Sequence, residues 1–351
     1  MILAGGQGTR LRPLTLTCPK PVVPLLNRPF LAYQLALLTQ HGVTDVTLAC
    51  SYRVEDIRSA LGEETPGAKL SYIVEKEPLG TGGGVRNAVD LAGGFVFVLN
   101  GDILTDADLT AMREFHEARG ARVTILLTRV ADPTQYGLVE TGKDGRIHRF
   151  REKPAPDEPV TADTVNAGVY LIDAELLRRM PADRPVSIER EFFPALIDDG
   201  VPCFGWCPPG PYWRDIGSPD AYREAQMDLL SGRVKTSLAP PGRLTGGAWV
   251  ARTATLAPAA RVVAPAVIGE RVRVAPGAQL GPRAVVGPGA SIGPDARVED
   301  AVLWARVEVG AGARLRECVV GSDARIGVRA EVGSGVVLEA GAVIADHARL
   351  P

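Results

Sequence analysis

The sequence has few aromatic residues and almost no net charge, and the second shortage excludes a class of function. Aromatics make up 5% of the 351 residues, and the formal net charge is −2. A nearly neutral chain has no overall basic field that attracts nucleic acid or an anionic membrane surface. Any phosphate-bearing ligand must be held by local charge, in a chain long enough for two domains.

Cysteines are few and scattered, and long apolar runs are missing. The five cysteines do not form a disulfide framework, and the pair Cys203 and Cys207 has no second Cys or His pair nearby for zinc. We interpret them as small apolar residues of strands or of the core. No apolar run approaches about 18 residues, and no signal sequence precedes the first strand. These features predict a cytoplasmic protein without a membrane span.

Glycine, by contrast, is plentiful, and it first gathers in the opening stretch Leu3–Lys20. The sequence LAGGQGTRLRPLTLTCPK places a glycine-rich turn after a short apolar strand, then a spaced arginine and lysine. Glycines let backbone N–H groups approach an anion, and arginine binds phosphate through two hydrogen bonds. The stretch is neither a P-loop nor the dinucleotide-binding fingerprint. It predicts a polyphosphate site, and the alternative is a flexible surface turn.

Short apolar runs alternate with helical periodicity in the first two thirds of the chain. The predicted strands are Val46–Cys50, Leu70–Val74, Phe95–Leu99 and Val123–Arg129, and the predicted helices are Phe30–Gln40, Val54–Leu61, Gly82–Asp90, Asp106–Arg119, Ile188–Ile197 and Ser218–Ser231. This alternation predicts an α/β, Rossmann-like, mostly parallel sheet, with an antiparallel addition between residues 138 and 172. Ligands bind at the carboxyl ends of such strands, where Leu3–Gly5 and Leu99–Asp102 lie.

A six-residue repeat occupies the last third of the chain. An aliphatic residue recurs at every sixth position from Val250 to Val298, and after slips in register the series continues to Leu350. The pattern predicts a parallel β-helix of about five to six coils, with glycine and alanine at the corners. A disordered Gly/Pro/Ala-rich tail is the alternative, which the strict step disfavours. We predict a catalytic domain over residues 1–235, a linker over 236–248 and the β-helix over 249–351.

Two acidic residues complete a site of phosphate chemistry. Asp102 follows an apolar strand in LNGD, and Asp215 lies in the loop YWRDIG. Such a carboxylate can hold Mg²⁺ with few protein ligands. The alternative for Asp102 is a helix N-cap, a role for which Asp106 is better placed. With Arg10 and Lys20, the two carboxylates suit phosphoryl or nucleotidyl transfer, which needs positioning and charge neutralisation.

Two further polar residues are candidates for a second substrate. Lys153, in REKP, is a candidate for a second phosphate, and its alternative is a solvated surface lysine. Asn166 lies in an otherwise apolar strand, where its amide must be hydrogen-bonded. Sugar hydroxyls and a structural network are equally good partners for that amide.

The motifs, in order, resemble those of the sugar-phosphate nucleotidyltransferases. They are LAGGQGTRLRPLT with PKPVVPL, EPLGTGG, LNGD, QYGLVE, REKP, NAGVYL, SIEREFFP and WRDIGSPDAY. The chain is most similar to the bacterial mannose-1-phosphate guanylyltransferases, which carry a C-terminal left-handed β-helix. The resemblance covers nearly the whole chain. It departs at Gly82, where relatives commonly have alanine, and at the leading strand, which is short enough to suggest a truncated start.

The resemblance implies a role for each matching residue. It implies nucleotide binding by Leu3, Ala4, Gly5, Gly6, Gly8, Thr9, Gly80, Thr81 and Asp102. It implies catalytic roles for Arg10, Lys20, Asp102, Lys153 and Asp215, with Mg²⁺ held by Asp102 and Asp215. It implies sugar-phosphate binding by Gly137, Glu152, Lys153 and Asn166. Arg10 and Lys20 would neutralise the phosphates that leave as pyrophosphate.

The implied reaction joins GTP and mannose-1-phosphate into GDP-mannose and pyrophosphate. Guanine presents N1–H and N2–H₂ donors that a carboxylate matches, and we predict Glu77 as the residue that reads the base. Glucose-1-phosphate with dTTP, UTP or ATP, and heptose phosphate with GTP, remain alternatives.

Two other classes of function are disfavoured. An acyltransferase of the β-helix type needs a histidine base between coils, and only His347 lies in the repeats, at their end. An inactive regulatory subunit would not need the charged residues retained here. We expect the β-helix to mediate self-association into a homo-oligomer or to close over the catalytic domain.

Overall fold

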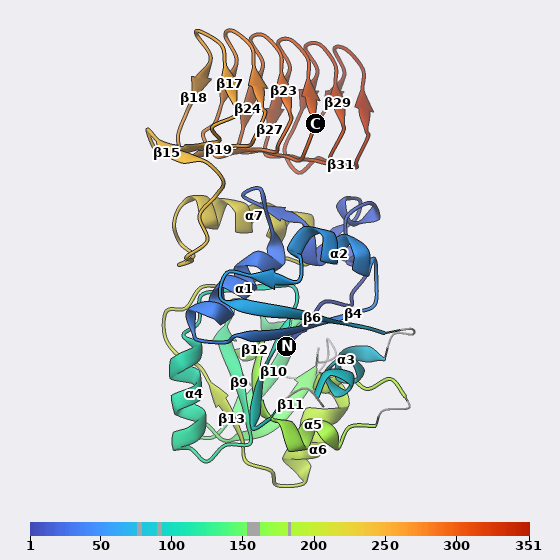
Figure 1. Ribbon diagram of the computed structural model, residues 1–351, viewed down its shortest axis with the longest axis vertical. Coiled ribbons are helices and arrows are strands. Elements are labelled where there is room, and N and C mark those ends of the chain that lie inside the picture. Colours follow the sequence, from blue (N-terminus) through green and yellow to red (C-terminus); the bar gives the residue numbers. More distant parts are fainter. Residues whose placement is uncertain (76–78, 90–92, 153–161, 182–183) are drawn as a thin grey trace. The chain divides into compact units, whose positions relative to one another are not determined.

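Segments far apart in the sequence combine into two compact units in the computed structural model of this protein (Figure 1). The structure describes residues 1–75, 79–89, 93–152, 162–181 and 184–351. The first unit comprises Met1–Gly6 and Gln34–Trp213, and the second comprises Gln7–Tyr33 and Arg214–Pro351. The chain therefore passes between the units three times, once inside the glycine-rich motif. The predicted boundaries at residues 235 and 249 stay a prediction.

A ten-stranded mixed sheet forms the centre of the first unit. Its strands run in the order β11-β10-β12-β7-β1-β4-β6-β5, and β9 pairs with both β12 and β13. They are β1 Ile2–Leu3, β4 Asp45–Cys50, β5 Glu64–Thr65, β6 Ala68–Val74, β7 Phe95–Asn100, β9 Val123–Arg129, β10 Gly137–Thr141, β11 Ile147–Glu152, β12 Thr164–Asp173 and β13 Cys203–Trp206. The neighbours β7, β1, β4 and β6 are parallel, whereas β12 is antiparallel to β7 and to β9. The α/β class is confirmed, with parallel pairing central and antiparallel pairing beyond it.

The helices agree with the sequence periodicity at most positions. They are α1 Phe30–Gln40, α2 Val54–Leu61, α3 Gly80–Ala88, α4 Leu109–Ala118, α5 Ala174–Arg178, α6 Phe193–Asp198 and α7 Pro219–Leu230, with a π-helix at Ile188–Phe192. The described residues before the repeats also contain short 3₁₀-helices and strands. The 3₁₀-helices are Thr9–Leu11, Leu14–Leu16, Lys20–Val22 and Pro133–Gln135, and the strands are β2 Pro24–Leu25, β3 Arg28–Pro29, β8 Ile103–Thr105 and β14 Trp213–Asp215. The first two helices have the predicted bounds.

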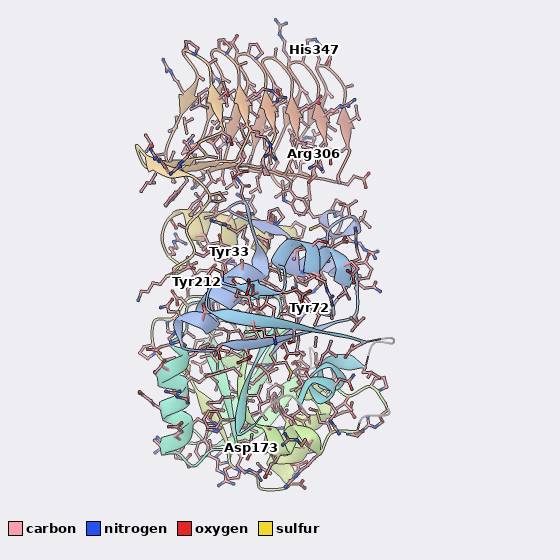
Figure 2. All side chains as sticks on the ribbon, in the orientation of Figure 1. Tyr33, Tyr72, Asp173, Tyr212, Arg306 and His347 are labelled. Carbon is pink, nitrogen blue, oxygen red and sulfur yellow. The ribbon has the colours of Figure 1, made fainter. Side chains whose placement is uncertain are left out.

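The predicted start of α4 is wrong by three residues. The carboxylate of Asp108 caps the helix by accepting from the Ala111 amide at 3.0 Å. Asp106 instead accepts from the Tyr212 amide at 2.7 Å (Tyr212 is labelled in Figure 2). Two aspartates of equal capping propensity precede the apolar run, and only the tertiary contact separates their roles.

The repeat region folds as a parallel β-solenoid with three sheets. The sheets are ordered β15-β16-β19-β22-β25-β28-β31, β17-β20-β23-β26-β29-β32 and β18-β21-β24-β27-β30-β33. The strands are β15 Arg243–Thr245, β16 Ala248–Val250, β17 Thr255–Leu256, β18 Arg261–Val262, β19 Ala266–Ile268, β20 Arg273–Val274, β21 Gln279–Leu280, β22 Ala284–Val286, β23 Ser291–Ile292, β24 Arg297–Glu299, β25 Val302–Leu303, β26 Glu308–Val309, β27 Arg314–Arg316, β28 Val319–Val320, β29 Arg325–Ile326, β30 Glu331–Val332, β31 Val337–Leu338, β32 Val343–Ile344 and β33 Arg349–Leu350. The predicted β-helix is confirmed.

The register slips in the repeat arise where a coil is one residue shorter than the coils before it. Ile268 pairs with Val286, which is 18 positions on, but Val286 pairs with Leu303, which is 17 positions on. Leu303 therefore fills the same interior column and is 1% exposed. The shortening keeps one aliphatic side chain per face stacked on the next.

The alanines lie at the corners of the solenoid, as predicted. Ala278, Ala290 and Ala296 each follow a turn and precede a strand, and their side chains are fully buried in the solenoid core. Glycines after the aliphatic position are required by close packing of coils. A Cβ on Gly287 would lie 2.4 Å from the carbonyl carbon of Trp304.

The cysteines are unpaired, in agreement with the prediction that they form no disulfide framework. All five cysteines are free, and burial raises the pKa of Cys50, Cys203 and Cys318 to about 12 in each case. Such thiols are protonated at neutral pH, in agreement with a structural role. Within the described ranges, no helix is long and apolar enough to cross a membrane.

Candidate active site

The first unit presents the strand exits that the sequence predicts. Gly101 follows β7, and its amide donates to the Leu3 carbonyl of β1 at 2.9 Å. A Cβ on Gly101 would lie 2.3 Å from that carbonyl oxygen, so only glycine fits where the two strands end. Gly5, in the loop after β1, accepts from the Ser51 hydroxyl, and a Cβ there would lie 2.8 Å from Ser51 Oγ. Close packing therefore requires a residue without a Cβ at both positions on this edge of the sheet.

The second unit holds the rest of the glycine-rich motif. Gly8 has φ of 64°, in the left-handed region, and precedes the 3₁₀ turn that carries Arg10. Its carbonyl accepts from the Thr15 hydroxyl at 2.7 Å. A Cβ on Gly8 would lie 3.0 Å from the Cβ of Lys20, so the glycine also permits the close approach of the lysine.

Arg10, Lys20 and Asp215 meet within the second unit. Arg10 Nη2 lies 3.4 Å from Asp215 Oδ2, and Lys20 Nζ lies 3.8 Å from Asp215 Oδ1. The lysine side chain is 10% exposed and the aspartate 18%, whereas Arg10 is 64% exposed. An arginine and a lysine side by side suit a bound phosphate. The structure therefore brings together the predicted phosphate-binding residues and one predicted metal ligand.

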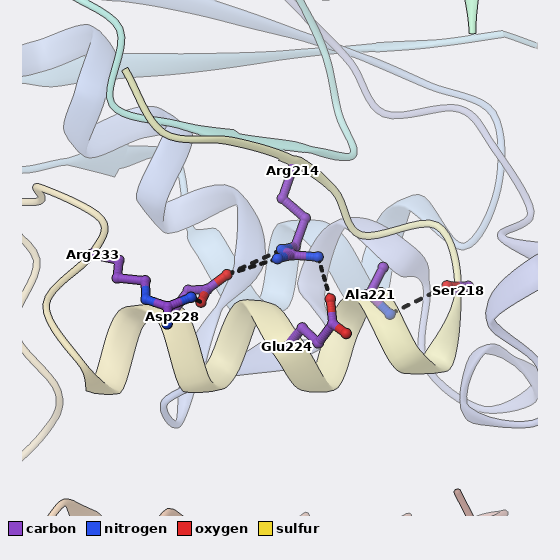
Figure 3. Close-up of polar contacts among 6 residues, drawn as sticks. All are labelled: Arg214, Ser218, Ala221, Glu224, Asp228 and Arg233. Carbon is purple, nitrogen blue, oxygen red and sulfur yellow. Dashed lines mark hydrogen bonds and ion pairs between the residues drawn. The ribbon is translucent and has the colours of Figure 1, made fainter. Parts of the chain in front are cut away.

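Arg214, the neighbour of Asp215 in β14, is bonded to side chains of helix α7. Figure 3 shows its guanidinium reaching the carboxylates of Glu224 and Asp228. Asp228 is 5% exposed and accepts from Arg214 Nη2 and from Arg233 Nη1, each at 2.9 Å. Ser218 caps the same helix by accepting from the Ala221 amide at 3.2 Å. These contacts fix the backbone that presents Asp215.

A hydrogen-bonded network joins the predicted nucleoside and sugar residues in the first unit. Asn166 Nδ2 donates to the Tyr170 hydroxyl at 2.8 Å, and that hydroxyl donates to Glu189 Oε1 at 3.4 Å. The Thr81 hydroxyl donates to Glu189 Oε2 at 2.9 Å. Asn166 Oδ1 accepts from the Gly168 amide at 2.9 Å. Both groups of the Asn166 amide have protein partners, so the structural network is present.

Burial holds Tyr170 in its neutral form within this network. The side chain is fully buried, and desolvation raises its pKa well above the ordinary value, with the Glu189 carboxylate adding to the effect. At neutral pH the phenol therefore keeps its proton and can both donate and accept a hydrogen bond. Glu189 lies in the π-helix, a distortion often found at functional sites.

Close packing explains three motif glycines in the first unit. Gly80 has φ of 72°, and a Cβ there would lie 2.5 Å from the Val186 carbonyl oxygen. A Cβ on Gly82 would lie 2.9 Å from the same oxygen, so this close approach favours glycine here. Gly137 pairs with Glu152 across β10 and β11, and a Cβ there would lie 2.6 Å from Glu152 Oε2. The two predicted sugar-binding residues are therefore neighbours.

Comparison with known proteins decides the family. Residues 1–232 match the nucleotidyl transferase family, and residues 262–350 match the GMPPB C-terminal domain family. The chain belongs to the nucleotidyl transferase family. A mannose-1-phosphate guanylyltransferase of Mycobacterium tuberculosis is 38% identical over 281 residues, which cover 75% of this chain and 77% of that protein.

Further relatives agree with this assignment to the family. The mannose-1-phosphate guanylyltransferase catalytic subunit beta of Danio rerio is 41% identical over 66% of this chain, and the match spans 62% of that protein's length. The crystal structure of HddC from Yersinia pseudotuberculosis, 28% identical, superposes with a TM-score of 0.56 and covers 65% of this chain and 97% of that one. HddC complexed with GMP-PN gives a TM-score of 0.55 at the same coverage.

Several predicted residues of this nucleotidyl transferase stay predictions. Glu77 and Lys153 lie outside the described residues. Asp102 follows β7 in the first unit and Asp215 lies in the second, so their joint role as metal ligands is untested. In the described part of the chain, no group of three or more His, Cys, Asp or Glu residues could hold a metal ion. A site of one or two carboxylates, completed by phosphate and water, agrees with that finding.

Glu75 and Glu189 are polar residues that the sequence analysis did not single out. Glu75 follows β6, and its Oε2 lies 3.5 Å from the Leu79 amide. Its Oε1 is buried and has no hydrogen-bond partner among the described residues. Burial raises the pKa of this carboxyl, and the Leu79 amide offsets part of the increase. The motifs EKEPLG and SIERE contained the signal, because each places an acid beside a glycine-rich or capped helix start.

We predict that Glu75→Gln stabilises the protein at neutral pH and leaves its stability at pH 4 unchanged. The folded-state pKa of Glu75 is raised, so the neutral form favours folding, and that contribution is lost as pH rises from 4.5 through the folded pKa. Glutamine has no such loss. The variant should melt a few degrees higher than the wild type at pH 7.5. Glu64→Gln, at an exposed position, is the control, and an equal gain at both pH values would contradict the prediction.

Proposed function

We propose that this protein transfers the guanylyl group of GTP to mannose-1-phosphate, giving GDP-mannose and pyrophosphate. The observation that carries the proposal is the meeting of Arg10 and Lys20 at Asp215 in the second unit. It is the arrangement expected where a polyphosphate must be neutralised as it leaves. Relatives named mannose-1-phosphate guanylyltransferase at 38% and 41% identity support the choice of substrates.

The proposed reaction is an in-line displacement at the α-phosphorus of GTP. A phosphate oxygen of the sugar phosphate forms the new bond to phosphorus, and the bond to the bridging oxygen of pyrophosphate breaks. Arg10 and Lys20 bind the β- and γ-phosphates and stabilise the charge that pyrophosphate gains. Lys153 is proposed to bind the phosphate of the sugar. In this proposal Gly137, Glu152 and Asn166 lie on the sugar side.

Magnesium is part of the proposal. Asp102 and Asp215 would hold the ion, and carboxylate oxygens are the donors that it prefers. When bound, the ion would supply positive charge that offsets the negative charge of the phosphates. The residues themselves position the triphosphate and hold its charge.

Pyrophosphate release from matched substrate pairs tests the proposed function. GTP, ATP, UTP and dTTP are each combined with mannose-, glucose- and heptose-1-phosphate, in Mg²⁺ and in excess EDTA. We expect the highest kcat/KM for GTP with mannose-1-phosphate and no turnover in EDTA. A higher kcat/KM for GTP with the heptose phosphate would favour that alternative.

Inosine triphosphate identifies the residue that reads the base. It lacks the N2 amino group, so a carboxylate that pairs with guanine loses one hydrogen bond to it. We predict that Glu77→Gln reduces the preference for GTP over ITP by about tenfold, the value of one hydrogen bond to a charged group. Glu75→Gln is tested in parallel as a second candidate for reading the base. Glu75 lies two positions from Glu77 along the chain, and its Oε1 has no hydrogen-bond partner among the described residues. An unchanged GTP/ITP ratio in Glu77→Gln would contradict that assignment.

We also propose that the solenoid mediates self-association. The match of residues 262–350 to a family of C-terminal domains supports a dedicated role for this part of the chain. Light scattering of the full chain tests the idea. A monomer at micromolar concentration would contradict it.

A further inference from the structure

Trp304 of the solenoid is buried against helix α7, inside the second unit. It follows β25 and is 4% exposed. Its indole Nε1–H donates to the Tyr222 hydroxyl at 2.9 Å, and the two rings meet edge to face with centroids 6.3 Å apart. Tyr222 is fully buried, and desolvation raises its pKa, so the phenol keeps its proton. A neutral hydroxyl that accepts from one group has a proton left to donate to another.

That proton goes to the segment that follows Lys20. The Tyr222 hydroxyl donates to the Pro24 carbonyl, and Gln226 Nε2 donates to the same oxygen at 2.7 Å. Gln226 Oε1 accepts in turn from the Leu26 amide at 2.7 Å. Both side chains are fully buried. Helix α7 therefore satisfies the polar backbone of the tight hairpin formed by β2 and β3.

The hairpin is joined closely to Lys20. The Val23 amide donates to the Lys20 carbonyl at 3.3 Å, and the Phe30 amide donates to the Val23 carbonyl at 3.0 Å. Val23 and Phe30 are fully buried, so this backbone has little freedom to shift alone. A short, continuous series of contacts thus runs from the solenoid to the backbone of a predicted phosphate-binding lysine.

Two other contacts hold the solenoid in place on this part of the unit. Asp300 is 5% exposed, and its carboxylate pairs with Arg223 of α7 at 3.0 Å and with Arg283 of the neighbouring coil. Asn27, at the tip of the hairpin, donates to the Val286 carbonyl of β22 at 2.9 Å. Helix and hairpin are thus each bonded directly to the coils that flank Trp304.

We propose that the solenoid is part of the apparatus that positions the triphosphate, with Trp304 and Tyr222 as positioning residues for Lys20. This inference rests on the proposed function for the identity of the ligand. The stacked coils supply a rigid support, because each coil is hydrogen-bonded to its neighbours along all three sheets. Side chains of α7 transmit that rigidity to a hairpin that could not bury its own polar groups.

Trp304→Phe tests the proposal, with Trp249→Phe in the first coils as the matched control. The phenyl ring keeps much of the packing and removes the indole N–H donor. We expect KM for GTP to rise about fivefold, with kcat and KM for mannose-1-phosphate within twofold of the wild type. We also expect faster amide hydrogen exchange in residues 20–27. Trp249→Phe should leave all of these values unchanged.

Tyr222→Phe provides the second variant, because it removes the acceptor of Trp304 and the donor to Pro24 together. It should reproduce the Trp304→Phe effects. The proposal is overturned if either variant keeps wild-type KM for GTP and wild-type exchange in residues 20–27. It is also overturned if exchange increases equally throughout the second unit, which would indicate general loosening. If GTP and mannose-1-phosphate are not substrates, the proposed function is wrong, and amide hydrogen exchange in residues 20–27 still tests the positioning role of Trp304 and Tyr222. Failure of one proposal can therefore be told from failure of the other.

Discussion

Replacing Asp215 with asparagine is expected to lower kcat on the order of 10²- to 10³-fold, the usual cost of removing one charge-stabilising group from an active site. Asparagine keeps the shape and loses the charge that lies 3.4 Å from Arg10 and 3.8 Å from Lys20. Arg10 and Lys20 keep their charges in the variant, so KM for GTP should change little. The Mg²⁺ concentration for half-maximal rate should rise, and titration of the initial rate with MgCl₂ measures both quantities.

Asp220→Asn is the control for this experiment. Asp220 is an exposed aspartate in the first turn of α7, five positions from Asp215. Its neutralisation should leave kcat and the Mg²⁺ requirement within about twofold of the wild type, since exposed charges contribute little. A kcat for Asp215→Asn within threefold of the wild type would exclude Asp215 from the catalytic site.

Glu189→Gln is expected to lower kcat/KM by about 10- to 100-fold, both for GTP and for mannose-1-phosphate. The carboxylate accepts from the hydroxyls of Thr81 and Tyr170, and an amide presents only one oxygen to them. One hydroxyl would lose its acceptor, and a buried group left unsatisfied costs about 1–3 kcal/mol. We expect KM to rise for GTP and for mannose-1-phosphate, because the network joins the residues predicted to bind each.

Glu191→Gln separates positioning from general stability. Glu191 lies in the same π-helix, and its carboxylate pairs with Arg184 at 2.7 Å on the exposed surface. This variant should keep wild-type kinetics. Combining Glu189→Gln with Tyr170→Phe should cost much less than the sum of the single changes, since both break one network. Additive losses, or a change in only one KM, would contradict a shared positioning role.

Local signals were sufficient for most of the elements. The helices Phe30–Gln40 and Val54–Leu61 have the predicted bounds, because apolar periodicity and flanking glycine act over a few residues. The six-residue repeat predicted the solenoid, because each coil contacts only its neighbours and one rule recurs along the chain. The coils that end at Leu303 and Val320 are one residue shorter than the others, and this became evident only in the structure. The interior stack of aliphatic side chains is kept when a corner residue is missing.

The candidate site was predicted in part. Arg10 and Lys20, from one motif, both lie within 4 Å of Asp215, which follows them by 205 and 195 positions along the chain. Glu189 had no assigned role before the structure, because its partner Thr81 is 108 positions away and no local pattern encodes such a contact. Asp106 and Asp108 show the same limit at short range, since a contact with Tyr212 decides which aspartate caps the helix.

By itself the sequence determined which chemical groups are available for phosphate binding and which repeat builds the solenoid. Glycines for close approach, cations for phosphate and a strict aliphatic step are properties of single residues and their spacing. Only the tertiary structure decided which of these groups share a unit. It places Leu3–Gly6 with the mixed sheet, and Arg10 and Lys20 with helix α7 and the solenoid. The physical reason is packing, because burial of side chains such as Tyr222 and Trp304 depends on segments distant along the chain.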